Sequence, residues 1–226
     1  MITKDQYRFI CEHVAFKNIR QEQFDELSKF IQYRRIPKDQ ILFFTGDTRD
    51  KFFLIYSGYV RIEQYDASDN YLYVDFVKPE ALFPYGGVFQ DEEYHYTAVA
   101  ITDLECFYIP RELFETFSLK STEQMAFLCS KLSQILRLHE LRLRNMINSS
   151  ATDRVIQSLA VLLFDVCGEE SVLPFPITIL ELAKLSGTTR ETVSQVMKRL
   201  KRKNIITYSH KRLTYMNRNV FLENLY

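Results

Sequence analysis

The sequence of 226 residues contains no tryptophan and has few of the residues that interrupt regular structure, with six glycines and six prolines. This composition excludes a low-complexity or disordered chain. The chain also lacks an excess of either charge, since 29 Lys and Arg residues balance 29 Asp and Glu residues. Its longest apolar runs, such as residues 159–164, fall short of the roughly 20 residues that a membrane span requires. We therefore expect a globular protein of one large or two small domains.

Cysteine is scarce as well, and the four cysteines are scattered at Cys11, Cys106, Cys129 and Cys167. They form no CxxC pair and have no close histidine partner, so we expect no metal, no iron–sulfur cluster and no other cofactor. Buried thiols that pack as small apolar side chains are the preferred interpretation. A redox sensor is the alternative, and it requires an exposed cysteine of low pKa.

Signals for export and for catalysis are missing too. The first residues contain no apolar segment and no cleavage site, which favours a cytoplasmic location. The four histidines show no spacing to an acid or a cysteine that suggests a catalytic dyad, and neither a P-loop nor a G-x-G-x-x-G motif occurs. The sequence therefore does not predict an enzyme.

The hydrophobic pattern changes twice along the chain. Apolar residues at spacings of three and four predict helix over residues 1–32. Short β-branched and aromatic runs, separated by Gly and Pro, then predict strands at 41–44, 52–62, 71–77, 97–101 and 105–109. Many short strands at close intervals are typical of a sandwich or a barrel-like roll. Helical spacing resumes after Pro110.

A heptad-like seam of about three repeats runs through the predicted helix that follows the strands. Leucines lie on more than one face of this helix, so more than one surface must cover them. A coiled-coil-like contact between two copies of the chain is the preferred interpretation, and packing on its own domain is the alternative. The residues expected at the contact are Met125, Leu128, Leu132, Ile135, Leu136, His139, Leu143 and Met146.

Positive charge is concentrated between Lys184 and Arg212, where nine basic residues accompany a single acidic one. The same region contains two capping-box patterns, Thr178 with Glu181 and Thr188 with Glu191, which predict helices that begin near residues 179 and 189. Gly187 lies between them, as a tight turn with positive φ requires. This layout predicts a helix-turn-helix, and a basic cluster on it indicates DNA binding.

Two short apolar runs follow, at 204–208 and 212–216, and they flank a basic tip at 209–211. They predict a two-stranded wing that contacts phosphates.

The stretch Ile-Thr-Ile-Leu-Glu-Leu-Ala at 177–183, Gly187, and Thr-Arg-Glu-Thr-Val-Ser at 189–194 together resemble the DNA-binding domain of the Crp/Fnr superfamily. This superfamily of bacterial regulators contains the cyclic-AMP receptor protein and the fumarate–nitrate regulator. The resemblance extends along the chain, and Gly58 lies where the β-roll of this family usually has a glycine. It implies an α+β protein with a cyclic-nucleotide-binding-like jelly roll and N-terminal helices at 1–118, a dimerisation helix at 119–148, and a winged helix-turn-helix at 149–226.

The resemblance also implies a homodimeric, sequence-specific transcription regulator. Its expected partners are double-stranded DNA with a pseudopalindromic operator, a second copy of the chain, and RNA polymerase, with no membrane. Arg190 and Glu191 match the pair that reads a G·C-containing half-site, and Ser194 matches a base-contacting serine. Gln195 departs from the usual arginine, and glutamine favours adenine. Residues expected to contact phosphates are Thr189, Lys198, Arg199, Lys201, Arg202, Lys211 and Arg212.

At the sensory end, residues 82–98 match the cassette that binds cyclic nucleotides in some family members. Tyr85 occupies the position of the ribose-binding Glu, and Tyr96, or His95 with a different gap, occupies that of the phosphate-binding Arg. No Lys or Arg lies between Lys78 and Arg111, so a buried phosphate would lack a cation. We therefore expect a degenerate cassette that binds no cyclic AMP, and the lone Cys11 does not indicate an iron–sulfur cluster.

Two alternatives stay open. The first is a ligand-gated regulator that binds a nucleotide or another small effector in the roll, with the candidate pocket residues Tyr85, Gly86, Gly87, His95, Tyr96 and Thr97. The same residues could instead simply fill the roll. The second alternative is a sensor that acts through protein contacts and whose helix-turn-helix is vestigial, and Gln195 is the feature in its favour.

Overall fold

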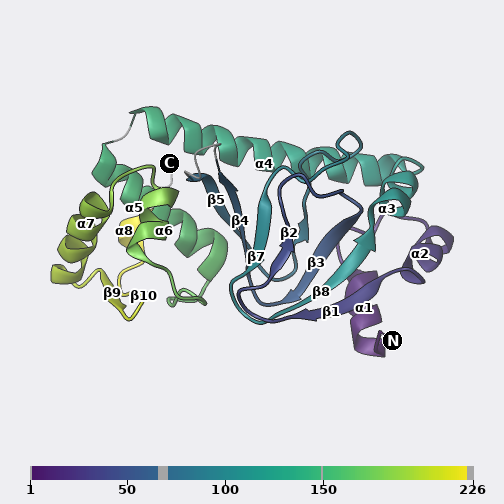
Figure 1. Ribbon diagram of the computed structural model, residues 1–226, viewed down its shortest axis with the longest axis horizontal. Helices are drawn as coiled ribbons and strands as arrows, with labels where there is room; N and C mark the ends of the chain where they lie inside the picture. Colours follow the sequence, from purple (N-terminus) through teal and green to yellow (C-terminus); the bar gives the residue numbers. More distant parts are fainter. Residues whose placement is uncertain (1, 66–70, 149, 223–226) are drawn as a thin grey trace. The chain divides into compact units, whose positions relative to one another are not determined.

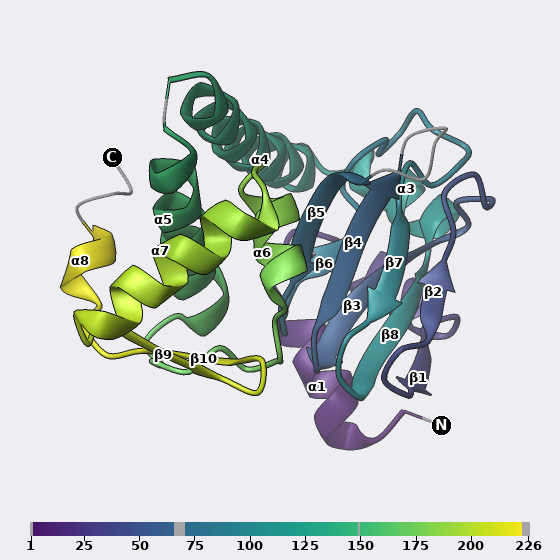
Figure 2. The same ribbon diagram turned by 60° about the vertical axis from the view of Figure 1, so that its left-hand side comes forward.

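The computed structural model describes residues 2–65, 71–148 and 150–222 (Figures 1 and 2). The chain divides into two compact units, Met1–Gln64 with Val77–Arg137 and Tyr65–Phe76 with Leu138–Tyr226. Among the described residues, no helix combines the length and the apolar character needed to cross a bilayer.

The N-terminal part of the chain forms a roll of two four-stranded sheets (Figure 1). One sheet has the strand order β1-β8-β3-β6 and the other the order β2-β7-β4-β5. The pairings of β8 with β1 and β3, and of β7 with β2 and β4, are all antiparallel. The strands are β1 (Gln32–Ile36), β2 (Ile41–Phe43), β3 (Lys51–Ser57), β4 (Val60–Tyr65), β5 (Tyr71–Val77), β6 (Leu82–Phe83), β7 (Thr97–Ala100) and β8 (Leu104–Pro110).

The predicted strands at 41–44, 71–77, 97–101 and 105–109 are confirmed as β2, β5, β7 and β8. The predicted run at 52–62 forms two strands, β3 and β4, because the chain turns at Gly58. Two strands are missing from the prediction. The largely exposed β1 lies at a sheet edge and reads Gln-Tyr-Arg-Arg-Ile, so it needs no apolar alternation, and β6 has only two residues.

Strand β3 is covered on both of its faces. Phe53 and Ile55 belong to the core between the sheets, whereas Phe52 and Leu54 belong to a second core beneath the helices. All four side chains are fully buried. This arrangement explains why the strand reads as a continuous apolar run rather than an alternating one.

Four helices contribute to that second core: α1 (Lys4–Glu12), α2 (Gln21–Ser28), α3 (Arg111–Ser118) and the start of α4 (Thr122–Asn148). The helical character expected over residues 1–32 is confirmed as two short helices, and β1 already begins at Gln32. Thr3 caps α1 through a reciprocal bond pair with Gln6. Ile10, Phe24 and Leu27 turn inward from the first two helices.

The C-terminal unit contains a helical core and a hairpin (Figure 2). Helix α5 (Ala151–Val161) continues into a π-helical turn at Leu162–Cys167, which ends at Gly168 with φ of 59°. Tyr215 donates a 2.7 Å hydrogen bond from its hydroxyl to the Leu159 carbonyl just before that turn. The remaining elements are α6 (Ile179–Leu185), α7 (Arg190–Arg202), β9 (Ile206–Ser209), β10 (Arg212–Tyr215) and α8 (Asn219–Leu222).

Glycine is required at the β3–β4 turn. Gly58 has φ of 88°, and a Cβ placed there would lie 2.3 Å from the Asp103 backbone oxygen. Gly46 has a similar φ of 86°, but a Cβ there would have no neighbour within 4 Å. The two glycines therefore separate the cost of the backbone conformation from the cost of a clash with backbone.

We expect Gly58→Ala to lower the free energy of unfolding by about 3 kcal/mol or more, because it adds a backbone clash to the roughly 1–2 kcal/mol of left-handed strain. The matched control Gly46→Ala should cost only about 1–2 kcal/mol. Urea denaturation followed by circular dichroism measures both values. Equal losses in the two variants would contradict the close contact at Gly58.

Candidate functional site

The turn between α6 and α7 is built by local capping. Thr178 caps α6, and the reciprocal bonds between Thr178 and Glu181 confirm the first predicted capping box. Gly187 has φ of 54°, as the predicted tight turn requires. The second box is wrong, because Thr189 rather than Thr188 is the N-cap. The Thr189 hydroxyl accepts the Thr192 N–H at 3.2 Å, so Glu191 is not the residue that closes the cap.

Helix α5 holds the same turn from the side. Arg154 donates from Nε to the Ser186 carbonyl and from Nη2 to the Gly187 carbonyl, both at 3.1 Å. Ser158 also donates to the Leu185 carbonyl at 3.4 Å. These bonds use backbone carbonyls that the end of α6 leaves without helical partners. Arg154 therefore fixes the entry to α7, a role that no motif in the sequence indicates.

Helix α7 has one buried face and one exposed face (Figure 2). Val193, Val196, Met197 and Leu200 are buried, and α7 contacts both α5 and α6. The predicted packing residues Leu182 and Ala183 of α6 are buried as well. Of the residues expected to read bases, Ser194 is half-buried and the other three are exposed. The exposed face carries Thr189, Arg190, Glu191, Gln195, Lys198, Arg199, Lys201 and Arg202.

The Glu191 carboxylate is ionised near neutral pH. Its pKa is lowered by a hydrogen bond from its own backbone N–H, by the Thr189 hydroxyl and by the nearby Arg190. A carboxylate in this state is purely an acceptor. Glu191 thus presents an acceptor beside the five guanidinium donors of Arg190, at the N-terminal end of an exposed helix.

The hairpin of β9 and β10 forms the predicted wing. Its strands pair in antiparallel register, and His210 and Lys211 at the tip have φ values of 49° and 65°, as in a two-residue turn of type I′. Lys211 and Arg212 are exposed at this tip. Lys201 differs from the expectation of a phosphate contact, since its ammonium donates to the Tyr208 carbonyl at 3.0 Å and ties α7 to the wing.

In the roll, the expected effector-pocket residues are divided among several surroundings, although Gly87 and His95 both lie beside the Asp91 side chain. Tyr85 packs in the core beneath the helices, and burial raises its pKa. Tyr96 packs against the core between the sheets. His95 bonds Asp91 at 2.7 Å, and the Thr97 hydroxyl accepts the Thr45 N–H at 3.2 Å. Gly86 is exposed and Gly87 has φ of 74°.

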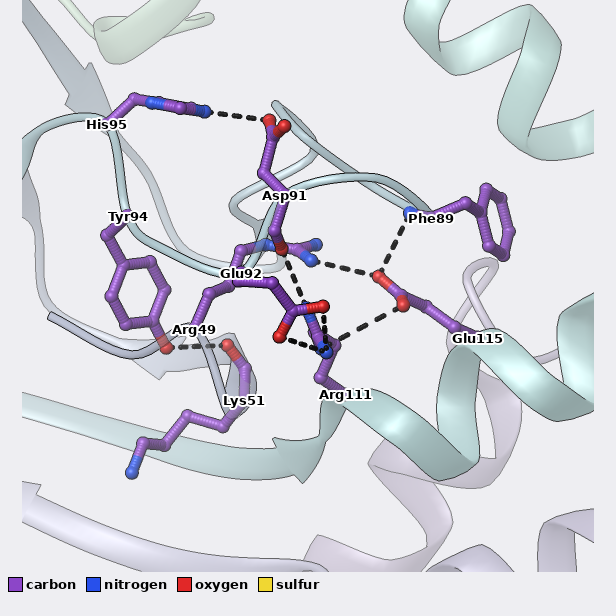
Figure 3. A network of polar contacts seen from close by, with 9 residues as sticks. All are labelled: Arg49, Lys51, Phe89, Asp91, Glu92, Tyr94, His95, Arg111 and Glu115. Atoms are coloured by element: carbon purple, nitrogen blue, oxygen red, sulfur yellow. Dashed lines mark hydrogen bonds and ion pairs between the residues drawn. The ribbon is translucent and has the colours of Figure 1, made fainter. Parts of the chain in front are cut away.

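The cations close to the cassette loop are already neutralised (Figure 3). Arg49 is 1% exposed, lies over the Phe52 ring and pairs with Glu115 at 2.9 Å. Arg111 donates to the Asp91 carbonyl at 2.6 Å and pairs with Glu92 at 3.3 Å. Arg111 therefore holds the loop directly, and Arg49 is joined to it through Glu115 and through a 2.8 Å bond from its backbone N–H to the Glu92 carbonyl. No motif or periodicity indicates this network, because its members are far apart along the chain.

The loop is also tied to Glu115 by its backbone. The Phe89 N–H donates to Glu115 Oε1 at 3.2 Å, which is the oxygen that pairs with Arg49. One carboxylate on α3 thus anchors the cassette loop and compensates a buried guanidinium (Figure 3).

Residues of the predicted seam on α4 differ in burial. Leu128 is 1% exposed and belongs to the core beneath the helices, and the partly buried Met125 and Ile135 pack against that core. The expectation that Leu128 contacts a second chain is corrected, because its own domain covers this side chain. Leu132, Leu136 and Leu143 are instead exposed, and Leu136 is 60% exposed. His139 is half-buried, and the Met146 side chain lies outside the described residues.

The cysteines differ in environment. Cys106 and Cys167 are buried, as expected, and burial raises their pKa values to about 12 and about 11. Cys129 on α4 is exposed, which corrects the expectation of burial for this residue. Within the ranges that the structure describes, no group of three or more His, Cys, Asp or Glu side chains is placed to hold a metal ion.

Comparison with known families assigns two segments. Residues 33–121 match the family described as cyclic nucleotide-binding domain, and residues 153–221 match the Crp-like helix-turn-helix domain. The first segment covers the roll and α3. The second segment covers Arg154, the turn between α6 and α7, helix α7 and the wing.

Several characterised proteins are similar over most of the chain. An HTH-type transcriptional regulator, ArcR, from Staphylococcus epidermidis is 28% identical over 76% of this chain and 77% of its own. The cyclic AMP receptor protein of Thermus thermophilus is 28% identical over 84% of this chain and 87% of its own. The solved structure of FixK2 from Bradyrhizobium japonicum covers 85% of this chain and 96% of its own, with a TM-score of 0.74 at 17% identity. The last similarity concerns the fold.

Proposed function

Since the chain belongs to the Crp/Fnr superfamily of bacterial transcription regulators, we propose that it binds specific DNA sequences as a homodimer. The exposed face of α7 would enter the major groove of each half-site. Two-fold symmetry of the dimer then requires a pseudopalindromic operator with half-sites about 34–36 Å apart. A cytoplasmic location and RNA polymerase as a partner go with this function, and no catalytic step is part of it.

The observation that carries the proposal is the placement of Arg190 and Glu191. Both are exposed at the first turn of a helix whose entry is fixed by Thr189 and Arg154. The N-terminal residues of a recognition helix are those that reach base edges. Arg190 would donate bidentately to guanine, and the ionised Glu191 would accept from cytosine N4. Gln195, one turn further and exposed, would read an adenine.

The remaining basic residues would contact phosphates. Lys198, Arg199 and Arg202 on α7, and Lys211 and Arg212 on the wing, are exposed. Lys201 would act indirectly, because it holds the wing to α7. Phosphate contacts release counterions, so affinity should fall steeply as salt rises.

The exposed leucines of α4 support dimerisation. Leu132, Leu136 and Leu143 continue the four- and seven-residue spacing of a coiled-coil seam, with His139 between them. Leu128, which lies on the same side of α4, is already buried in the roll. A second copy of α4, packed in parallel, would cover the exposed stripe.

We expect Arg190→Ala to weaken binding to the selected operator by about 1–3 kcal/mol and to relax specificity at one base pair. The control Lys198→Ala should weaken binding to all duplexes alike, and it should reduce the slope of the logarithm of affinity against the logarithm of salt concentration by about one. The operator is first selected from random duplexes with the purified wild-type protein, and affinities are then measured by fluorescence anisotropy. A uniform loss for Arg190→Ala would reassign this residue to a phosphate.

We expect Leu136→Asp to convert the dimer to a monomer, since it places a charge in the proposed seam. Leu119→Asp is the matched control, because Leu119 is equally exposed, at 62%, but lies outside α4. Sedimentation velocity at several concentrations gives the mass of each species. A Leu136→Asp protein that stays dimeric would place the interface elsewhere.

The cassette is proposed to be degenerate. Tyr85 is buried beneath the helices, and Arg49 and Arg111 are paired with carboxylates, so a cyclic phosphate would meet no available cation there. Isothermal titration with cyclic AMP should therefore show no saturable heat. Saturable binding near one molecule per chain would contradict a degenerate cassette and favour the nucleotide-gated alternative.

A ligand-gated regulator remains a second candidate function, and one observation favours it. The roll contains a cavity of about 290 Å³ beside α4. Of the residues that line this cavity, Leu82 and Tyr85 belong to the cassette and the others lie outside it.

A further inference from the structure

The cavity is bounded by three segments of the N-terminal unit. The chain after α1 contributes His13 and Val14, the β5–β6 connection contributes Glu80, and α4 contributes its residues from Phe127 to Gln134. Its volume of about 290 Å³ is just below the range of roughly 300–1,000 Å³ that ligand pockets occupy. Such a space suits only a small ligand.

One side of the cavity is apolar and aromatic. Leu82 and Tyr85 are buried members of the core beneath the helices, and the partly buried Phe127 packs against them. Because Tyr85 belongs to a packed core, this wall is preformed. Two aromatic rings in the lining, from Tyr85 of the roll and Phe127 of α4, favour a ligand with a flat aromatic body.

The polar part of the lining comes from α4. Ser130 and Lys131 lie three and four residues after Phe127, and Gln134 lies seven residues after it, so these polar side chains flank Phe127 on one face of the helix. Lys131 is half-buried, and in the described residues it takes part in no ion pair. An ammonium with a hydroxyl and an amide beside it is a ready set of donors for a carboxylate.

His13 and Glu80 fix the rim of the cavity. The Ala15 N–H donates to His13 Nδ1 at 3.2 Å, so His13 Nε2 carries the proton and donates to the Glu80 carbonyl at 2.8 Å. Burial lowers the pKa of His13, so the ring is neutral near pH 7. Glu80 has φ of 64°, an unusual conformation for this residue, and its carboxylate is exposed at the rim.

The rim carries no net charge, since Lys131 supplies one positive charge, Glu80 supplies one negative charge and His13 supplies none. Coulomb energy is proportional to the ligand charge, so the net charge of the rim does not select between a monoanion and a dianion. The favourable contact for an anion is the single ammonium of Lys131, with Ser130 and Gln134 beside it. We propose that this cavity binds a small aromatic monocarboxylate, with its carboxylate on Lys131 and its ring between Tyr85 and Phe127. This deepens the ligand-gated candidate by naming a ligand class and a site mostly outside the cassette.

The test uses the full-length protein and isothermal titration with phenylacetate, with 2-phenylethanol as the uncharged analogue. We expect saturable binding of phenylacetate with a Kd below about 1 mM and binding at least about tenfold weaker for 2-phenylethanol. Lys131→Met, which keeps the stem and removes the charge, should weaken phenylacetate binding about tenfold or more. Val14→Trp should abolish binding, because Val14 is 54% exposed at the cavity and a bulky ring there would block it without disturbing the core.

Lys17→Met is the matched control, since Lys17 is exposed nearby but does not line the cavity. Its phenylacetate affinity should equal that of the wild type. The proposal is overturned by three results: no saturable heat in the wild type, equal affinity for the uncharged analogue, or unchanged affinity in Lys131→Met and Val14→Trp. None of these measurements involves DNA, so failure here is distinguishable from failure of the proposed function.

Discussion

Burial of apolar side chains on both faces of β3 is the constraint around which the N-terminal unit is organised. Phe53 and Ile55 require the second sheet, and Phe52 and Leu54 require a layer of helices. At about 25 cal/mol per Å² of apolar surface, leaving either face open would cost several kcal/mol. The helices α1, α2 and α3 and the first turns of α4 supply the second cover. Tyr85 of the cassette is buried in that same core.

The apolar residues of helix α4 are only partly buried within their own domain. Leu128 and its neighbours are buried by the roll, while Leu132, Leu136 and Leu143 stay exposed. Scattered exposed leucines are ordinary, but a stripe at coiled-coil spacing is not. The first turns of α4 bury part of the core beneath the helices, and the exposed leucines of α4 need a further surface to bury them. The proposed homodimer would cover this exposed stripe.

The sequence predicts best where structure is local. Thr178 with Glu181 and the turn at Gly187 are set by residues within a few positions, so the helix-turn-helix could be located without knowledge of the fold. The misplaced second cap shows the limit, because Thr188 and Thr189 are both able to cap and only backbone conformation decides between them. The hydrogen bond from Arg154 to the Ser186 carbonyl and the ion pair of Arg49 with Glu115 join residues that are far apart in the chain. Periodicity does not report such pairs, and neither could be predicted.

The position of the cavity would give the proposed ligand a direct effect on the proposed dimer interface. Ser130, Lys131 and Gln134 line the cavity, while Leu132 and Leu136 of the same two turns are exposed on another side of α4. A ligand bound to Lys131 would change the rotation or the stability of those turns, and therefore the fit of the leucine stripe to a second copy. By linkage, a ligand that favours the dimer must itself bind more tightly to the dimer than to the monomer. A ligand with equal affinity for both states would occupy the cavity without regulating anything, so differential affinity, rather than occupancy, is what would make this cavity a sensor.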